Sequence, residues 1–153
     1  MPGDAARLFE LRTASIRQLA SRELSAVEIF EWAARVTFAD MERRIREMEV
    51  WVAEAPDARG AARTILGWMA VDGERLEGLY TDPRFERRGV ATQLLDAAED
   101  LVRRRGGERL RADASRNAEA FYFRRGYAPE GPPLPHGPQP VVKRLAGGCE
   151  APR

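Results

Sequence analysis

Apolar residues in the first third of the chain recur at helical spacing and predict three helices. The first helix follows Asp4, which can cap it, and carries its apolar residues up to Leu19. Ser25 and Glu28 have the spacing of a capping box and predict a second, short helix. The segment over residues 38–48 places methionine and isoleucine on one side and predicts the third helix.

The period of the pattern then changes to two, which is typical of strands. Residues 50–53 and 64–71 are expected to be strands, and Asp72-Gly73 is a hairpin signal that leads into a returning strand at Arg75–Thr81. Strict alternation along this last strand predicts that Leu76, Gly78 and Tyr80 share one face and that Glu77, Leu79 and Thr81 share the other.

An apolar stripe over residues 90–102 predicts a long helix, and the pair Gly106-Gly107 is expected to end it. The pattern then predicts a strand over residues 110–114 and a short helix over 117–125. A proline-rich loop and a final strand over 141–145 follow. This order of elements predicts a mixed α/β domain built around one sheet.

Composition limits the classes of function. With 153 residues and 44% hydrophobic residues, the chain is long and apolar enough to form one globular domain. The 25 basic residues are balanced by 24 acidic ones, which argues against a protein that binds nucleic acids through a basic surface. Lys143 is the single lysine, so Schiff-base chemistry and a lysine-containing phosphate loop are practically excluded.

Cysteine and histidine usage excludes further classes. Cys149 has no second cysteine to pair with, and together with His136, the single histidine, it does not make a metal cluster. No apolar run reaches the roughly 20 residues that span a bilayer. The first residues lack the basic and apolar regions of a signal peptide. These features predict a soluble, cytoplasmic protein that needs no metal and does not bind a membrane.

The candidate chemistry lies where the third strand passes into the long helix. The first turn of a helix exposes unpaired backbone N–H groups, and Gly89 has no Cβ to keep a phosphate away from them. Arg87 and Arg88 add positive charge, and Ala91 is small. This pattern predicts a phosphate-bearing ligand, although a solvated arginine loop before an ordinary core helix would have the same sequence features.

Two stretches of the chain resemble motifs of the GNAT acetyltransferases. That family carries Gln/Arg-x-x-Gly-x-Gly/Ala at this junction, where the chain has Glu86-Arg87-Arg88-Gly89-Val90-Ala91. The second stretch runs from Asn117 through Phe121-Tyr122 to Arg125-Gly126-Tyr127 and is similar to the family's Asn-x-x-Ala-x-x-Phe-Tyr-x-x-x-Gly-Phe/Tyr pattern. The resemblance covers about half of the chain. It implies the GNAT fold, a mostly antiparallel sheet flanked by helices, in a single domain over residues 1–146 with a flexible tail over 147–153.

The chain departs from the family pattern at two places. Glu86 stands where glutamine or arginine is usual, and an acidic group beside a pyrophosphate is expected to weaken binding without abolishing it. Family members open with a β-strand, whereas this chain opens with the predicted helix after Asp4. We therefore expect a sheet from which the first β-strand is missing.

The resemblance also implies acetyl-CoA as co-substrate and assigns its contacts. The pantetheine arm would pair with the strand residues Leu79, Tyr80 and Thr81, and Asn117 would help to position it. The residues expected to hold the pyrophosphate are Arg87, Arg88, Gly89, Val90, Ala91 and Thr92.

The implied reaction is transfer of the acetyl group to a primary amine by direct attack. Tyr122 would act as the general acid for the departing thiolate, and Glu77 would act as the general base, through a water molecule. Ser115 could assist by hydrogen bonding. Each assignment has a structural alternative, because Tyr122 could be a packing aromatic residue and Glu77 a solvent-facing strand residue.

The acceptor is not identified by any motif, and it could be a small molecule or a peptide. The N-terminal helices and the proline-rich loop that contains His136 are expected to border its site. A catalytically degenerate, CoA-binding regulatory module remains the alternative function, and the balanced charge disfavours an arginine-rich nucleic-acid binder. The expected partners are acetyl-CoA and an amine, with no nucleic acid and no membrane, and a homodimer is one candidate assembly.

Overall fold

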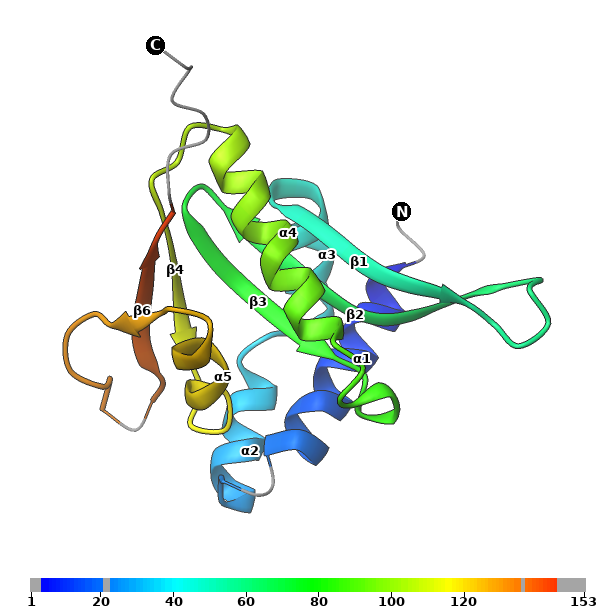
Figure 1. Cartoon of the computed structure of the whole chain (residues 1–153). Helices are drawn as coiled ribbons and strands as arrows, with labels where there is room; N and C mark the ends of the chain where they lie inside the picture. The colour runs from blue at the N-terminus through cyan, green and yellow to red at the C-terminus, as the bar shows by residue number, and fades with distance from the viewer. Residues whose placement is uncertain (1–3, 21–22, 136, 146–153) are drawn as a thin grey trace, which may run out of the picture.

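The computed structural model describes residues 4–20, 23–135 and 137–145, and it contains the three expected N-terminal helices (Figure 1). These are α1 (Asp4–Leu19), α2 (Ala26–Ala34) and α3 (Phe38–Glu47). The expected capping box starts α2, with the backbone N–H of Glu28 donating to Ser25 Oγ at 3.2 Å and that of Ser25 donating to Glu28 Oε2 at 2.8 Å. Thr37 and Asp40 form a second capping box before α3. The expectations for residues 147–153 and for His136 lie outside the described residues.

Within the described ranges, six strands form one sheet in the order β1-β2-β3-β4-β6-β5. They are β1 (Glu49–Pro56), β2 (Arg63–Asp72), β3 (Arg75–Thr81), β4 (Arg109–Ala114), β5 (Ala128–Pro129) and β6 (Gln139–Arg144). All neighbours pair antiparallel except β3 and β4, which are parallel and are joined through α4 (Val90–Arg104). Among the described residues, the chain enters the sheet at β1, which lies on an edge and pairs with β2.

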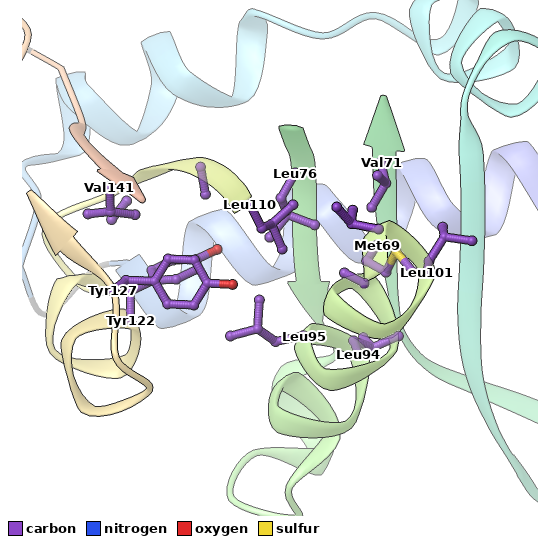
Figure 2. Close-up of a cluster of buried hydrophobic side chains, with 14 of the residues drawn as sticks. Met69, Val71, Leu76, Leu94, Leu95, Leu101, Leu110, Tyr122, Tyr127 and Val141 are labelled. Atoms are coloured by element: carbon purple, nitrogen blue, oxygen red, sulfur yellow. The ribbon is translucent and has the colours of Figure 1, made fainter. Parts of the chain in front are cut away.

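Helices cover both faces of the sheet (Figure 1). Helix α4 packs on one face, where its apolar stripe joins a buried cluster with Met69 and Val71 of β2 (Figure 2). Helices α1 and α3 pack on the other face, around the fully buried Trp68. Trp68 Nε1 donates to the carbonyl oxygen of Leu8 at 3.1 Å, which satisfies its polar atom and fixes α1 to the sheet.

The first turn of α4 packs directly against Gly67 of β2. A Cβ at Gly67 would lie 2.8 Å from the carbonyl oxygen of Tyr80 and 2.9 Å from Val90 Cγ1. Any larger residue would therefore push the start of α4 away from β2 and β3.

The alternation predicted for β3 is wrong in its first half, because the strand contains a β-bulge. Ala70 of β2 pairs with Gly78, but the next residue, Val71, pairs with Leu76, so that Glu77 is an extra residue in the ladder. A bulge depends on the partner strand, which the alternation of a single segment does not report.

The bulge separates Glu77 from the face on which it was expected. Leu76 and Leu79 both pack into the cluster under α4, although strict alternation would put them on opposite faces. Tyr80 packs into the cluster around Trp68, on the other side. The Glu77 side chain instead contacts Arg75, so it does not share a face with Leu79 and Thr81.

Strands β3 and β4 are paired over a very short distance. Their register contains Arg75 with Arg111 and Leu76 with Ala112, and beyond these pairs the two strands diverge (Figure 1). Since β3 continues to Thr81 and β4 to Ala114, the sheet opens between their C-terminal ends. The opening is bordered by α2, by α5 (Glu119–Arg124) and by the turn that precedes α5.

Candidate functional site

A cavity of 570 Å³ lies at the opening between β3 and β4. One wall is residues 75–80 of β3, a second is formed by residues 113 and 115–118 at and after the end of β4, and α2 supplies the third. This volume is in the range of ligand sites for small molecules. Its position at the end of two diverging strands gives an extended ligand access to the backbone of β3.

The structure brings together six of the residues predicted from sequence. The residues that line the cavity are Glu77, Leu79, Tyr80, Ser115, Asn117 and Tyr122. Asn117 lies in the turn before α5, and its Oδ1 accepts a hydrogen bond from the Ser115 hydroxyl at 2.7 Å. Thr81, the last residue of β3, does not line the cavity. The predicted pyrophosphate loop does not line it either and lies at the neighbouring start of α4.

The start of α4 has the geometry expected for binding an anion. Gly89 precedes the helix with φ 75°, a left-handed conformation that glycine adopts without strain, and no side chain caps the helix. A Cβ at Gly89 would meet nothing within 4 Å. The space beside Gly89, where the backbone N–H groups of the first turn of α4 begin, is therefore open. Arg87 also has a positive φ, of 65°, so this loop places two left-handed residues before the helix.

The arginines of this loop are exposed, and two of them stack on the same ring. The guanidinium carbons of Arg84 and Arg88 lie 5.4 and 5.3 Å from the centroid of the Phe85 ring. Arg87, Arg88 and Glu86 are all exposed beside Gly89, so the predicted pair of basic residues and the acidic departure from the motif share one surface.

Asp82 anchors the loop to α1. It is buried and accepts hydrogen bonds from Arg84, through the side chain at 2.8 Å and the backbone N–H at 3.0 Å, and from Arg7 of α1 at 2.6 Å. Burial alone would raise its pKa, but the hydrogen bonds from Arg84 and Arg7 outweigh burial and lower the pKa of Asp82 to about 2. The carboxylate therefore stays ionised and holds the loop in place.

Arg125 connects α5 to the first turn of α4, a link that sequence reasoning missed. Its guanidinium donates to Thr92 Oγ1 at 2.5 Å and lies 4.9 Å from the ring centroid of Phe121. The Arg125 Nε atom is buried and has no hydrogen-bond partner among the described residues. The motif pattern contained Arg125 but gave no sign of its contact with Thr92, which lies 33 positions earlier.

Tyr122 lines the cavity, and its ring lies 5.4 Å, centroid to centroid, from that of Tyr127 (Figure 2). The side chain is 5% exposed. Burial raises the pKa of the Tyr122 hydroxyl far above its usual value, and the nearby Tyr80 and Asp113 raise it further. The phenol is therefore protonated at neutral pH and can donate a hydrogen bond.

Glu77 belongs to a charge cluster that spans the opening. Arg75 Nε lies 3.1 Å from Glu77 Oε1, and Arg75 Nη2 lies 2.5 Å from Asp113 Oδ2 of β4. Arg44 of α3 donates to the carbonyl oxygen of Glu77 at 3.3 Å. Sequence reasoning missed Arg75 and Asp113, because nothing local in the sequence shows that β3 and β4 are neighbours.

Other classes of site are not found in the part of the chain that the structure describes. Within residues 4–20, 23–135 and 137–145, no group of three or more histidine, cysteine, aspartate or glutamate side chains could hold a metal ion. None of the helices in these ranges has the length and apolar character to cross a membrane.

The sequence was compared with protein families and with known proteins. The model of a family described as acetyltransferase (GNAT) domain matches residues 20–136. The chain is 28% identical over 126 residues to YafP of Escherichia coli, described as an uncharacterized N-acetyltransferase, covering 82% of this chain and 76% of the relative.

Solved structures also share the whole fold. A GCN5-related N-acetyltransferase from Rhodopseudomonas palustris superposes with a TM-score of 0.83 at 28% identity, covering 95% of this chain and 92% of that one. The PaiA N-acetyltransferase from Thermoplasma acidophilum, solved in complex with coenzyme A, gives a TM-score of 0.73 at 18% identity, with 94% of both chains covered. Because the family model spans the helix start, the strand opening and the Tyr122 segment, the chain belongs to the GNAT acetyltransferase family.

Proposed function

We propose that this protein transfers the acetyl group of acetyl-CoA to a primary amine of a small molecule or peptide, by direct attack of the amine on the thioester. One observation carries the proposal: β3 and β4 diverge beside a helix start that has no side-chain cap. Beyond Leu76, no strand of the described residues pairs with β3 on its β4 side, so an extended ligand arm can pair with residues 79–81 as a strand would.

The residues around the helix start fit a pyrophosphate. The N–H groups of Val90, Ala91 and Thr92 and the open space in front of Gly89 would receive its oxygens. Arg87 and Arg88 would contribute positive charge. Asn117, on the wall opposite β3, would position the arm that leads to the thioester.

The cavity offers groups for both proton transfers of the reaction. The amine must lose a proton before its lone pair forms the C–N bond, and Glu77 would accept that proton through a water molecule. As the C–S bond breaks, the electron pair leaves with the thiolate, and Tyr122 would give its proton to that thiolate. The attacking nitrogen must lose a second proton to become the amide, and that proton would restore Tyr122. The backbone N–H groups of β3 beyond the bulge would stabilise the charge that develops on the thioester oxygen.

A CoA-binding module without turnover is the second candidate, and one observation favours it. Arg75 Nε lies 3.1 Å from Glu77 Oε1, so the carboxylate proposed as the base is already engaged by a cation of its own strand. Asp113 shares Arg75, so the two carboxylates compete for one cation and either could be released to accept a proton.

Two measurements on the purified protein test the proposal. Calorimetry with acetyl-CoA measures cofactor binding, and release of free thiol over a panel of primary amines measures transfer. We expect saturable binding and amine-dependent thiol release. Binding without thiol release on any amine would favour the module, and absence of binding would refute both candidates.

A further inference from the structure

Arg12 of α1 is a buried cation on the wall of the cavity. Its side chain is 1% exposed, and its guanidinium carbon lies 5.5 Å from the centroid of the Tyr80 ring. The two terminal nitrogens donate to the carbonyl oxygens of Ala33 and Trp32, both at 3.0 Å, at the end of α2. Its Nε atom is buried and has no hydrogen-bond partner among the described residues.

No carboxylate of the described chain forms an ion pair with Arg12. Buried charges in proteins are paired, because removing a charge from water costs far more than carbonyl dipoles return. Since Arg12 lines a cavity, an anion bound in that cavity is the simplest counterion for it.

The remaining charges of the cavity are unevenly paired. Its arginines are Arg12, Arg35, Arg44, Arg75 and Arg116, and its acids are Glu28, Glu31, Glu77 and Asp113. Arg116 pairs with Glu28, and Arg75 is shared by Glu77 and Asp113. Within the described residues, three arginines of the cavity have no ion pair: Arg12, Arg35 and Arg44. Of the acids that line the cavity, Glu31 also has no ion pair within these residues.

The two ends of the cavity differ in charge. On the side of β3 and β4, the two carboxylates of Glu77 and Asp113 are balanced by Arg75, which contacts both, and by Arg44, whose side chain donates to the carbonyl oxygen of Glu77. These two carboxylates can accept hydrogen bonds from an amine. Along α1 and α2, Arg12 and the exposed Arg35 favour an oxyanion. This arrangement matches a small acceptor that carries an amine and an anionic group in one molecule.

We infer that the acceptor is an amino acid-like molecule, whose anionic group binds Arg12 and Arg35 while its amine faces Glu77 and Asp113. The inference rests on the proposed transfer reaction and specifies the substrate class of the same site. A carboxylate is the commonest group of this kind, and a phosphonate has the same chemistry toward arginine.

Matched amines test the inference. Thiol release is measured with L-phenylalanine, with its amide and with phenethylamine, and in a second set with an aminoalkylphosphonate and the corresponding alkylamine. We expect kcat/KM to be about 10- to 100-fold higher for a charged member than for its uncharged partner, the range for a hydrogen bond to a charged group. A preference for the carboxylate or for the phosphonate identifies the anionic group. Equal or better turnover of the uncharged amines would overturn the inference and leave the transfer reaction standing.

Binding of the product class needs no turnover, and it separates the two proposals. Calorimetry in the presence of CoA compares N-acetyl-L-phenylalanine with its amide, and the phosphonate counterpart with its uncharged analogue. Tighter binding of a charged member supports the inference even if no amine is turned over. Failure of every charged member to bind more tightly would contradict it.

Arg35→Gln tests the residue assignment, because Arg35 is exposed and its loss should not unfold the chain. We expect KM for the charged acceptor to rise about 10-fold, with unchanged KM for the matched amide and unchanged affinity for acetyl-CoA. Arg17→Gln, at an exposed position of α1 outside the cavity, is the control. Equal effects of Arg35→Gln on the charged and uncharged acceptors would argue against the assignment.

Discussion

Arg125 and Thr92 join the segment that carries Tyr122 to the start of α4. The 2.5 Å hydrogen bond between the Arg125 guanidinium and the Thr92 hydroxyl connects two stretches that the motifs had assigned to different tasks. One stretch was expected to bind pyrophosphate and the other to supply the general acid. Their contact means that a shift of the loop on binding can reach α5 directly.

Arg125→Gln should weaken acetyl-CoA binding by about 10-fold and lower kcat, because it removes a cation beside the helix start and the hydrogen bond to Thr92. Calorimetry and steady-state kinetics measure the two effects. Arg124→Gln, at the neighbouring exposed position, is the control and should leave both unchanged. Wild-type affinity in the Arg125 variant would remove this residue from the cofactor site.

Gly89→Glu should abolish acetyl-CoA binding, because it puts a side chain and a negative charge into the open space before α4. Gly60→Glu is a matched control, since Gly60 also has a positive φ and open surroundings but lies in the turn between β1 and β2. The control therefore reports the cost of a side chain at a left-handed glycine. Equal calorimetric affinity of the two variants for acetyl-CoA would refute the loop assignment.

Tyr122→Phe should lower kcat by about 100-fold or more, with little change in the affinity for acetyl-CoA, because it removes the proposed proton donor. Tyr127→Phe is the contrasting variant. It removes the 3.0 Å hydrogen bond to the buried Glu99, so it should lower the free energy of unfolding by about 1–3 kcal/mol and spare kcat. Full turnover in the Tyr122 variant would assign that ring to packing.

Glu77→Gln should lower kcat/KM at neutral pH, and the loss should shrink at higher pH, where more of the amine is already deprotonated. Asp113→Asn is assayed alongside, because both carboxylates contact Arg75. The variant with the larger and more pH-dependent loss identifies the base. Wild-type profiles for both would show that neither carboxylate accepts the proton.

Asp82→Asn should destabilise the fold by about 2 kcal/mol at pH 7, as implied by a pKa lowered from 3.8 to about 2. A depressed carboxylate pKa stabilises the folded state above the unfolded value, and this stabilisation is lost as the pH falls from about 4 to about 2. Urea unfolding at a series of pH values should therefore show that the free energy of unfolding falls less steeply with decreasing pH in the variant than in the native chain. An equal decrease of the free energy of unfolding at acidic pH in both proteins would contradict the lowered pKa of Asp82.

Short sequence patterns predicted the secondary structure well, but they did not predict contacts between distant segments. The capping box at Ser25 and the apolar stripe of α4 each depend on residues that are close together in the sequence, and the structure confirms both. The bulge at Glu77 depends on the register with β2, and the strand pattern therefore placed that side chain on the wrong face. The roles of Glu77 and Tyr122 stay predictions.

The same limit explains which site residues were missed. Arg12 meets the end of α2 about 20 positions later, and Arg75 meets Asp113 across 38 positions. An arginine among 25 basic residues gives no sequence sign of such a partner. The glycine loop and the tyrosine could be found because their motifs are continuous in the chain.

The short pairing of β3 with β4 also affects the stability of the sheet. The ladder between the β1-β2-β3 half and the β4-β6-β5 half contains two residue pairs, so a molecule that lies along the gap would add contacts to both halves. An occupied gap should therefore slow amide hydrogen exchange in both halves at once, including strands that the molecule does not touch.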